Sequence, residues 1–194
     1  MHWIDPDALP ETSGHIESLV YNPRGELDGL VLDGDRLVHL APHFAATLRR
    51  RVKAGARVAV RGIKPRDAQL LVAVAVEIDG RRFTDDGPGG PHQDHGHDRP
   101  EPPSTRPADI VGNVRLTLFA PRGEVCGALL HDGTIVRLHP KGNAALADYF
   151  APGRRIEVWG PAFRKGGVDV VDVDHVAFIA ESEDEAQSFA DDAR

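Results

Sequence analysis

Three histidines and two aspartates alternate within a short segment near the middle of the chain. They are His92, Asp94, His95, His97 and Asp98. Imidazole nitrogens and carboxylate oxygens are ligands for Zn²⁺, Ni²⁺ or Cu²⁺, so the histidines form a candidate metal site. A flexible ligand set binds weakly because it must be ordered on binding. The same composition is also typical of a polar, low-complexity linker with no ligand. No other cofactor is predicted.

Cations and flat side chains form a second group of chemically capable residues. Together they suit single-stranded nucleic acid, because cations contact phosphates and flat rings stack on bases. The candidates occur in two series along the chain. The first series is Tyr21, Arg24, Arg36, His39, Lys64 and Arg66, and the second is Phe119, Arg122, Arg137, Lys141, Trp159, Phe163, Arg164 and Lys165. Residues 161–167 form the densest segment, with an aromatic ring, two cations and two glycines. Solvated loop cations and rings that pack on a neighbouring domain are the alternative interpretation.

Motifs for catalysis are missing from the sequence. It has no phosphate-binding loop, no GxGxxG motif and no cysteine pair for zinc. The carboxylates are not arranged as a local acid/base pair. The single cysteine, Cys126, excludes an internal disulfide and is expected to be a plain strand residue. We therefore expect a binding protein and not an enzyme.

The net charge of −7 over 194 residues is unevenly distributed. Residues 1–83 carry about +1 and residues 108–180 carry zero, whereas residues 84–107 carry −3 and residues 181–194 carry −5. The segment 84–107 contains six prolines and four glycines, which predicts a linker, and the last segment predicts an acidic tail. No apolar run has the length of a membrane span and no signal peptide is recognised, so we expect a cytoplasmic protein without a membrane partner.

The two near-neutral regions are copies of each other. A gap-free register with an offset of 98 runs from Gly14 and Gly112 to Gly62 and Gly160, and about a third of its positions are identical. Pro-Arg-Gly-Glu at 23–26 returns at 121–124. We interpret this motif mainly as a hairpin turn in which Arg and Glu pair. The pattern predicts a tandem duplication, with domains at 1–83 and 108–180.

The residue pattern of each copy predicts three strands, a short helix and two more strands in about 70 residues. The strands are expected at 15–21, 27–32, 37–40, 57–61 and 70–78, and at 113–119, 125–130, 135–138, 155–159 and 168–178. The helix is expected to begin at Pro42 and at Pro140 and to run through 44–52 and through 144–150. This order is typical of the OB-fold. We therefore predict an all-β chain with one short helix per domain, folded as two tandem OB-fold-like five-stranded β-barrels. An SH3-like or other small barrel is the alternative.

Alternation in the first strand of each copy predicts which side chains face inward. Ser18, Leu116 and Leu118 are expected inside the barrels, and Tyr21 and Phe119 outside. In OB-folds, the outer face of strands two and three binds ligands together with loops one-two and four-five.

The segments at 22–33 (NPRGELDGLVLD) and 38–43 (VHLAPH) resemble small bacterial proteins of the OB-fold nucleic-acid-binding-domain type. The resemblance covers both copies, although His39 and His43 become Arg137 and Lys141 in the second. It implies a non-enzymatic module that binds single-stranded DNA or RNA. A module that binds a protein partner and no nucleic acid is the alternative.

Overall fold

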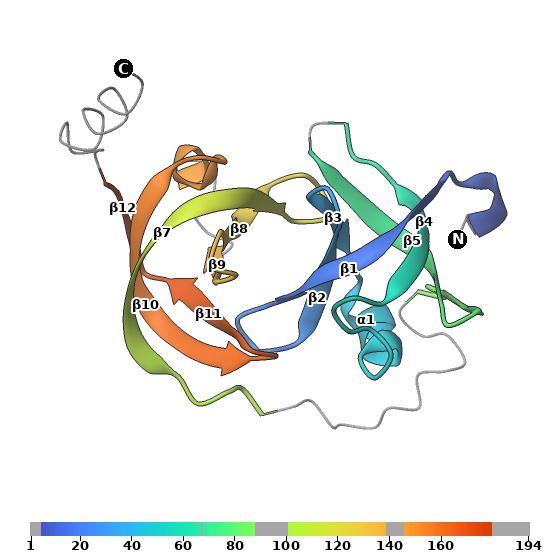
Figure 1. Ribbon diagram of the computed structural model, residues 1–194, viewed down its shortest axis with the longest axis horizontal. Coiled ribbons are helices and arrows are strands. Elements are labelled where there is room, and N and C mark those ends of the chain that lie inside the picture. Colours follow the sequence, from blue (N-terminus) through green and yellow to red (C-terminus); the bar gives the residue numbers. More distant parts are fainter. Residues whose placement is uncertain (1–4, 67, 88–100, 139–145, 180–194) are drawn as a thin grey trace, which may run out of the picture.

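The computed structural model describes residues 5–66, 68–87, 101–138 and 146–179, which form two β-barrels (Figure 1). Barrel one contains β1 (Glu11–Tyr21), β2 (Leu27–Leu32), β3 (Arg36–His39), α1 (Pro42–Leu48), β4 (Arg57–Ile63), β5 (Leu70–Ile78) and β6 (Arg81–Thr84), preceded by the 3-10 turn η1 (Pro6–Ala8). Barrel two contains β7 (Arg106–Phe119), β8 (Val125–Leu130), β9 (Ile135–Leu138), η2 (Ala147–Phe150), β10 (Arg155–Lys165), β11 (Val168–Val173) and β12 (His175–Phe178).

The five barrel strands pair in the same order in both barrels, and barrel one has β6 as an additional strand paired with β5. β1 lies between β2 and β4, β3 follows β2, and β5 follows β4. A parallel pairing of β3 with β5 closes the first barrel, and β9 with β11 closes the second. Closure leaves few free strand edges, which small β-sheets otherwise have to protect. The prediction of two OB-fold-like barrels is confirmed.

The first hairpin turn shows why the repeated Pro-Arg-Gly-Glu motif is used. Gly25 has a φ of 73° and Gly123 a φ of 95°, a conformation that glycine adopts without steric cost. The Asn22 side chain accepts hydrogen bonds from the backbone of Arg24 and Glu26, and its amide donates to the Glu26 carboxylate at 2.9 Å. Glu26 therefore pairs with Asn22, and the Arg24 side chain is exposed.

The first strand of each copy is bulged at the same places. Register shifts fall between Ile16 and Ser18 in β1, and between Val114 and Leu116 in β7. A bulge adds an unpaired residue, which reverses the faces of the side chains beyond it. Our prediction that Leu116 and Leu118 point into barrel two is therefore wrong, because both pack in the hydrophobic cluster of barrel one.

Glycine is required where β2 and β8 approach the next strand. A Cβ at Gly127 would collide with the carbonyl oxygen of Val136, and one at Gly29 would lie 2.5 Å from that of Val38. Mid-strand glycines at these positions let the two backbones come close enough to curve the barrel.

The largest departure from the predicted strands is at β10. We expected a loop at 161–167, but β10 continues to Lys165 and only Gly166 and Gly167 form the turn. Pro161 lies opposite Pro107 in β7. The fifth strand is interrupted at Asp174, which separates β11 from β12.

The remaining boundaries differ in smaller ways. α1 ends at Leu48, earlier than predicted, and in barrel two the described part of the helix is the turn η2. β6 reaches Thr84 and β7 begins at Arg106, so strands extend into both ends of the predicted linker. Among the described residues, no helix is both long and apolar enough to cross a membrane.

Candidate functional site

The outer faces of the two barrels pack against each other. Barrel two has its own interior cluster, which includes Val114, Val136 and Ile156. A second set of its residues belongs instead to the cluster of barrel one: Leu116, Leu118, Cys126, Leu129, Ile135, Phe163 and Val170. These residues come from β7, β8, β9, β10 and β11. The face of strands two and three, where OB-folds usually bind ligands, is therefore covered in this chain.

A buried ion pair lies in the middle of this contact. Arg137 of β9 donates to Asp28 of β2 at 2.7 Å, and both side chains are largely covered, with 10% and 16% exposed. The His39 ring lies 4.0 Å from the same carboxylate. The pKa of His39 is lowered overall. Burial is the main cause and Arg137 adds to it, whereas the nearby Asp28 acts in the opposite direction. Burial raises the pKa of the Cys126 thiol in the same region.

A second ion cluster joins the barrels at their surface. Arg115 of β7 contacts Glu17 at 2.6 Å and Asp35 at 2.7 Å. Glu17 and Arg115 are equivalent positions of the two copies. Equivalent residues meet each other only near a twofold axis, so the barrels are related by an approximate twofold rotation.

Several of the predicted site residues are covered by this packing. Tyr21 is 8% exposed and Phe163 is 5% exposed, and burial raises the pKa of the Tyr21 hydroxyl. A Cβ at Gly166, in the β10–β11 turn, would lie 2.6 Å from the Tyr21 hydroxyl oxygen. Tyr21 does point out of its own barrel, but the other barrel covers it. Neither ring, nor the buried Arg137, is open for stacking or for phosphate in this arrangement.

The twofold packing places the β1–β2 turn beside the end of β10, and the β7–β8 turn beside the β4–β5 loop (Figure 1). A Cβ at Gly25 would lie 3.5 Å from the Phe163 ring, and a Cβ at Gly123 would lie 3.6 Å from Ala68. Each of these junctions carries exposed cations. The first cation cluster is Arg24, Arg164 and Lys165, and the second is Arg122, Lys64 and Arg66.

Most of these cations have no acidic partner within the part of the chain that the structure describes. Arg164 is the exception, since it lies 3.3 Å from Asp169 and donates to the carbonyl of Gly167 at 2.8 Å. That contact holds the Arg164 side chain on the β10–β11 turn. All six residues are among the sequence candidates, but the sequence did not predict that they come together in pairs of turns from different barrels.

The other predicted residues lie elsewhere. Phe119 is half-buried against the cluster of barrel one. Arg36 is exposed and lies 3.5 Å from Asp33. Lys141, His92, His95 and His97 lie outside the described residues. Within the described ranges, no group of three or more His, Cys, Asp or Glu side chains is arranged to hold a metal ion.

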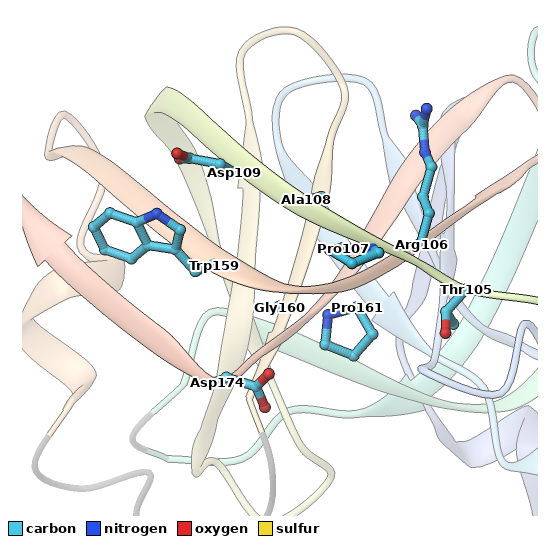
Figure 2. A pocket seen from close by; sticks show the side chains of 9 residues that line it. All are labelled: Thr105, Arg106, Pro107, Ala108, Asp109, Trp159, Gly160, Pro161 and Asp174. Atoms are coloured by element: carbon cyan, nitrogen blue, oxygen red, sulfur yellow. The ribbon is translucent and has the colours of Figure 1, made fainter.

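Trp159 lies in an open groove on the other side of barrel two, which we call the Trp159 groove (Figure 2). The groove has a volume of about 520 Å³. Its lining comes from β7, from β10 and from the bend at Asp174. Trp159 is half-buried and lies opposite Asp109 on β7 and His175 on β12. The lining residues are Thr105, Arg106, Pro107, Ala108, Asp109, Trp159, Gly160, Pro161 and Asp174.

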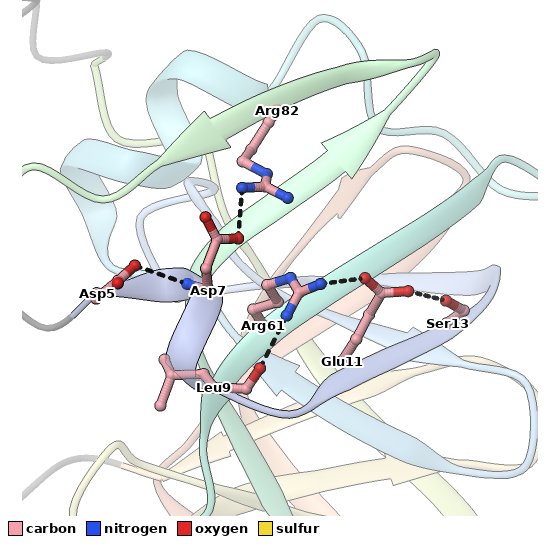
Figure 3. A network of polar contacts seen from close by, with 7 residues as sticks. All are labelled: Asp5, Asp7, Leu9, Glu11, Ser13, Arg61 and Arg82. Carbon is pink, nitrogen blue, oxygen red and sulfur yellow. Dashed lines mark hydrogen bonds and ion pairs between the residues drawn. The ribbon is translucent and has the colours of Figure 1, made fainter.

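On the equivalent face of barrel one, a network of polar contacts holds the N-terminal segment (Figure 3). Arg61 occupies the position equivalent to Trp159. It donates to the Leu9 carbonyl at 3.0 Å and to the Glu11 carboxylate at 2.9 Å. Arg82 holds Asp7 of η1 at 2.8 Å. These contacts fix the N-terminal segment over the sheet. Arg61, Asp109 and Arg115 were not among the sequence candidates, although all three lie at positions where the copies differ.

The comparisons with known proteins add little to this picture. The sequence matches no family model and none of the curated proteins. Two crystal structures of the single-stranded DNA binding protein from Thermus aquaticus are similar in part. The deletion mutant delta 228-252 R190A is 14% identical, with 89% of this chain and 94% of that chain covered and a TM-score of 0.28. The wild type is 12% identical, with 89% and 92% covered and a TM-score of 0.29.

Proposed function

We propose that this chain binds single-stranded nucleic acid through the two cation clusters at the junctions between its barrels. The observation that carries the proposal is the pairing of loops. Each junction combines loop one-two of one barrel with loop four-five of the other, and these are the loops that contact oligonucleotides in OB-folds. Twofold packing thereby makes two similar, exposed, positive sites from one chain.

The charge distribution supports phosphate as the group that these sites recognise. Arg122, Lys64 and Arg66 are exposed, and none has an acidic partner among the described residues. The same holds for Arg24 and Lys165. Unpaired cations on loops release counterions when they contact phosphates, which drives binding without sequence recognition.

The covered faces define what kind of binding to expect. Tyr21 and Phe163 are buried, so the stacking surface of a usual OB-fold is small in this chain. Contacts to the nucleic acid backbone therefore dominate. We expect little preference among base sequences, strong dependence on salt, and tighter binding by strands long enough to reach both clusters.

The test is fluorescence anisotropy of labelled oligothymidylates of increasing length, titrated with the full chain at several salt concentrations. If all six cations contact phosphates, log K falls with log salt at a slope of about −4. Changing Arg24, Arg164 and Lys165 together to alanine should reduce this slope by about 2, and changing Lys64, Arg66 and Arg122 should do the same.

A matched control removes three exposed cations elsewhere. Arg49, Arg50 and Lys53 lie at the end of α1 and just beyond it, and are exposed. Their triple alanine variant has the same net charge as either cluster variant. The proposal is wrong if this control weakens binding as much as the cluster variants, or if no oligonucleotide binds at low salt.

A further inference from the structure

One carboxylate on the first strand lies opposite a different residue in each of the two copies. In barrel one, Glu11 lies opposite Arg61, and the guanidinium contacts it at 2.9 Å. In barrel two, Asp109 takes the place of Glu11 and lies opposite Trp159. The acidic side chain is retained, and the cation that neutralises it in the first copy has become an indole.

Within the part of the chain that the structure describes, no cation takes the place beside Asp109 that Arg61 takes beside Glu11. Glu157 lies near Asp109, and its pKa is raised by partial burial and by the negative charge of Asp109. Asp174 lines the opposite side. Arg106 also lines the groove, but its guanidinium points away from Trp159 and lies 3.8 Å from Asp169 (Figure 2).

We propose that the Trp159 groove binds an arginine or lysine side chain from a basic segment of a partner polypeptide. The ligand cation would take the place that Arg61 holds in barrel one. An indole face attracts a guanidinium or an ammonium group, and tryptophan does so best among aromatic side chains. The neighbouring carboxylates add charge complementarity. The groove volume of about 520 Å³ is in the range of sites that hold a small ligand.

The same features disfavour nucleic acid in this groove. Asp109, Glu157 and Asp174 repel phosphates, although the indole alone could stack on a base. The cation clusters of the proposed function lie on the loops at the junction of the barrels. Binding of a basic peptide and binding of nucleic acid are therefore separable, and either can fail without the other.

The test follows the indole N–H signals of the two tryptophans by NMR while an oligoarginine peptide is added to the full chain. The Trp159 signal should shift with saturation, and the signal of Trp3 should not follow it. Oligoglutamate should have no effect. The proposal is overturned if the two signals respond equally, or if oligothymidylate shifts Trp159 and the basic peptide does not.

Three variants identify the groups involved. Asp109→Asn should weaken peptide binding about twofold to fivefold, because one exposed ion contact is lost. Glu77→Gln, an exposed carboxylate on β5 of barrel one, is the matched control and should change nothing. Trp159→Arg restores the arrangement of barrel one and should abolish binding measured by calorimetry. Unchanged binding in Trp159→Arg would refute the proposal even if the peptide binds elsewhere on the acidic chain.

Discussion

In barrel one β1 pairs with β4 in the same register in which β7 pairs with β10 in barrel two, but the first face is covered and the second is open. Arg61 holds the N-terminal segment over β1 and β4 in barrel one. Trp159 leaves β7 and β10 accessible in barrel two. At the contact between the barrels, the copies differ in a complementary way, with Asp28 and Glu17 in one facing Arg137 and Arg115 in the other. After a duplication, one shared framework can thus acquire both an internal interface and a free surface.

The largest effect should come from breaking the buried ion pair between the barrels. Arg137→Ala leaves the Asp28 carboxylate buried without its partner, which costs about 3–5 kcal/mol. Urea unfolding measures this loss. Arg164→Ala breaks an exposed ion pair and should cost no more than about 1 kcal/mol. Equal losses for both variants would mean that the interface contributes no more than a surface contact.

The second-largest effect on stability is expected at two aromatic rings that occupy equivalent positions in the two copies. Tyr21 is buried between the barrels and Phe119 is half-buried. Tyr21→Ala should cost about 3 kcal/mol and Phe119→Ala roughly half as much, because less apolar surface is lost. Thermal unfolding of both variants checks the order. A larger loss for Phe119→Ala would contradict the asymmetric burial described above.

Closure of barrel one should depend on Arg61. Arg61→Ala removes hydrogen bonds to the Leu9 carbonyl and the Glu11 carboxylate, with a loss of about 1–2 kcal/mol. Hydrogen exchange should show the amides of residues 5–10 losing protection while those of β7 keep theirs. Protection lost equally in both barrels would indicate general destabilisation instead of local opening.

Trp159→Arg should reproduce the closed face in barrel two. The new guanidinium can pair with Asp109 as Arg61 does with Glu11. Stability should rise by up to about 1 kcal/mol, the usual range for a surface ion pair. The matched change, Arg61→Trp, should destabilise barrel one. Stability changes of the same sign in both variants would disprove the equivalence of the two positions.

The smallest effect is a pH dependence confined to barrel two, where Glu157 replaces Ala59. The pKa of Glu157 is raised above its ordinary value of 4.5, so the folded state binds its proton more tightly. Wild-type stability from this group is therefore present below about pH 4.5 and is lost as the pH rises through the raised pKa. Glu157→Gln should be more stable than wild type at neutral pH only. A constant difference across pH would exclude Glu157 as the cause.

Much of each barrel could be predicted from the sequence because both copies carry the same pattern. The strands 27–32, 125–130, 135–138 and 70–78 agree with the structure. The extension of β10 was missed because Pro161 and the glycines after it are typical of a loop, whereas the pairing of Pro161 with Pro107 on β7 is a long-range contact.

The site was harder to predict for a different reason. Apolar residues on the outer face of a barrel give the same sequence pattern whether they contact a ligand or a second barrel. Tyr21 and Phe163 could therefore be assigned to a ligand site or to an interface between barrels. The exposed cations were found because charge and turn residues are local signals. Their grouping depends on the packing of two barrels, which depends on long-range contacts such as Arg137 with Asp28.

The Glu17–Arg115 contact determines which pairs of barrels have complementary charges at the twofold axis. A pair of two first barrels would bring glutamate to glutamate near the axis, and a pair of two second barrels would bring arginine to arginine. Only the unlike pair satisfies both charges. The contact is the same whether the two barrels belong to one chain or to two. Two chains could therefore exchange barrels without losing this interaction. The covalent connection decides between these outcomes by keeping the correct partner at high local concentration.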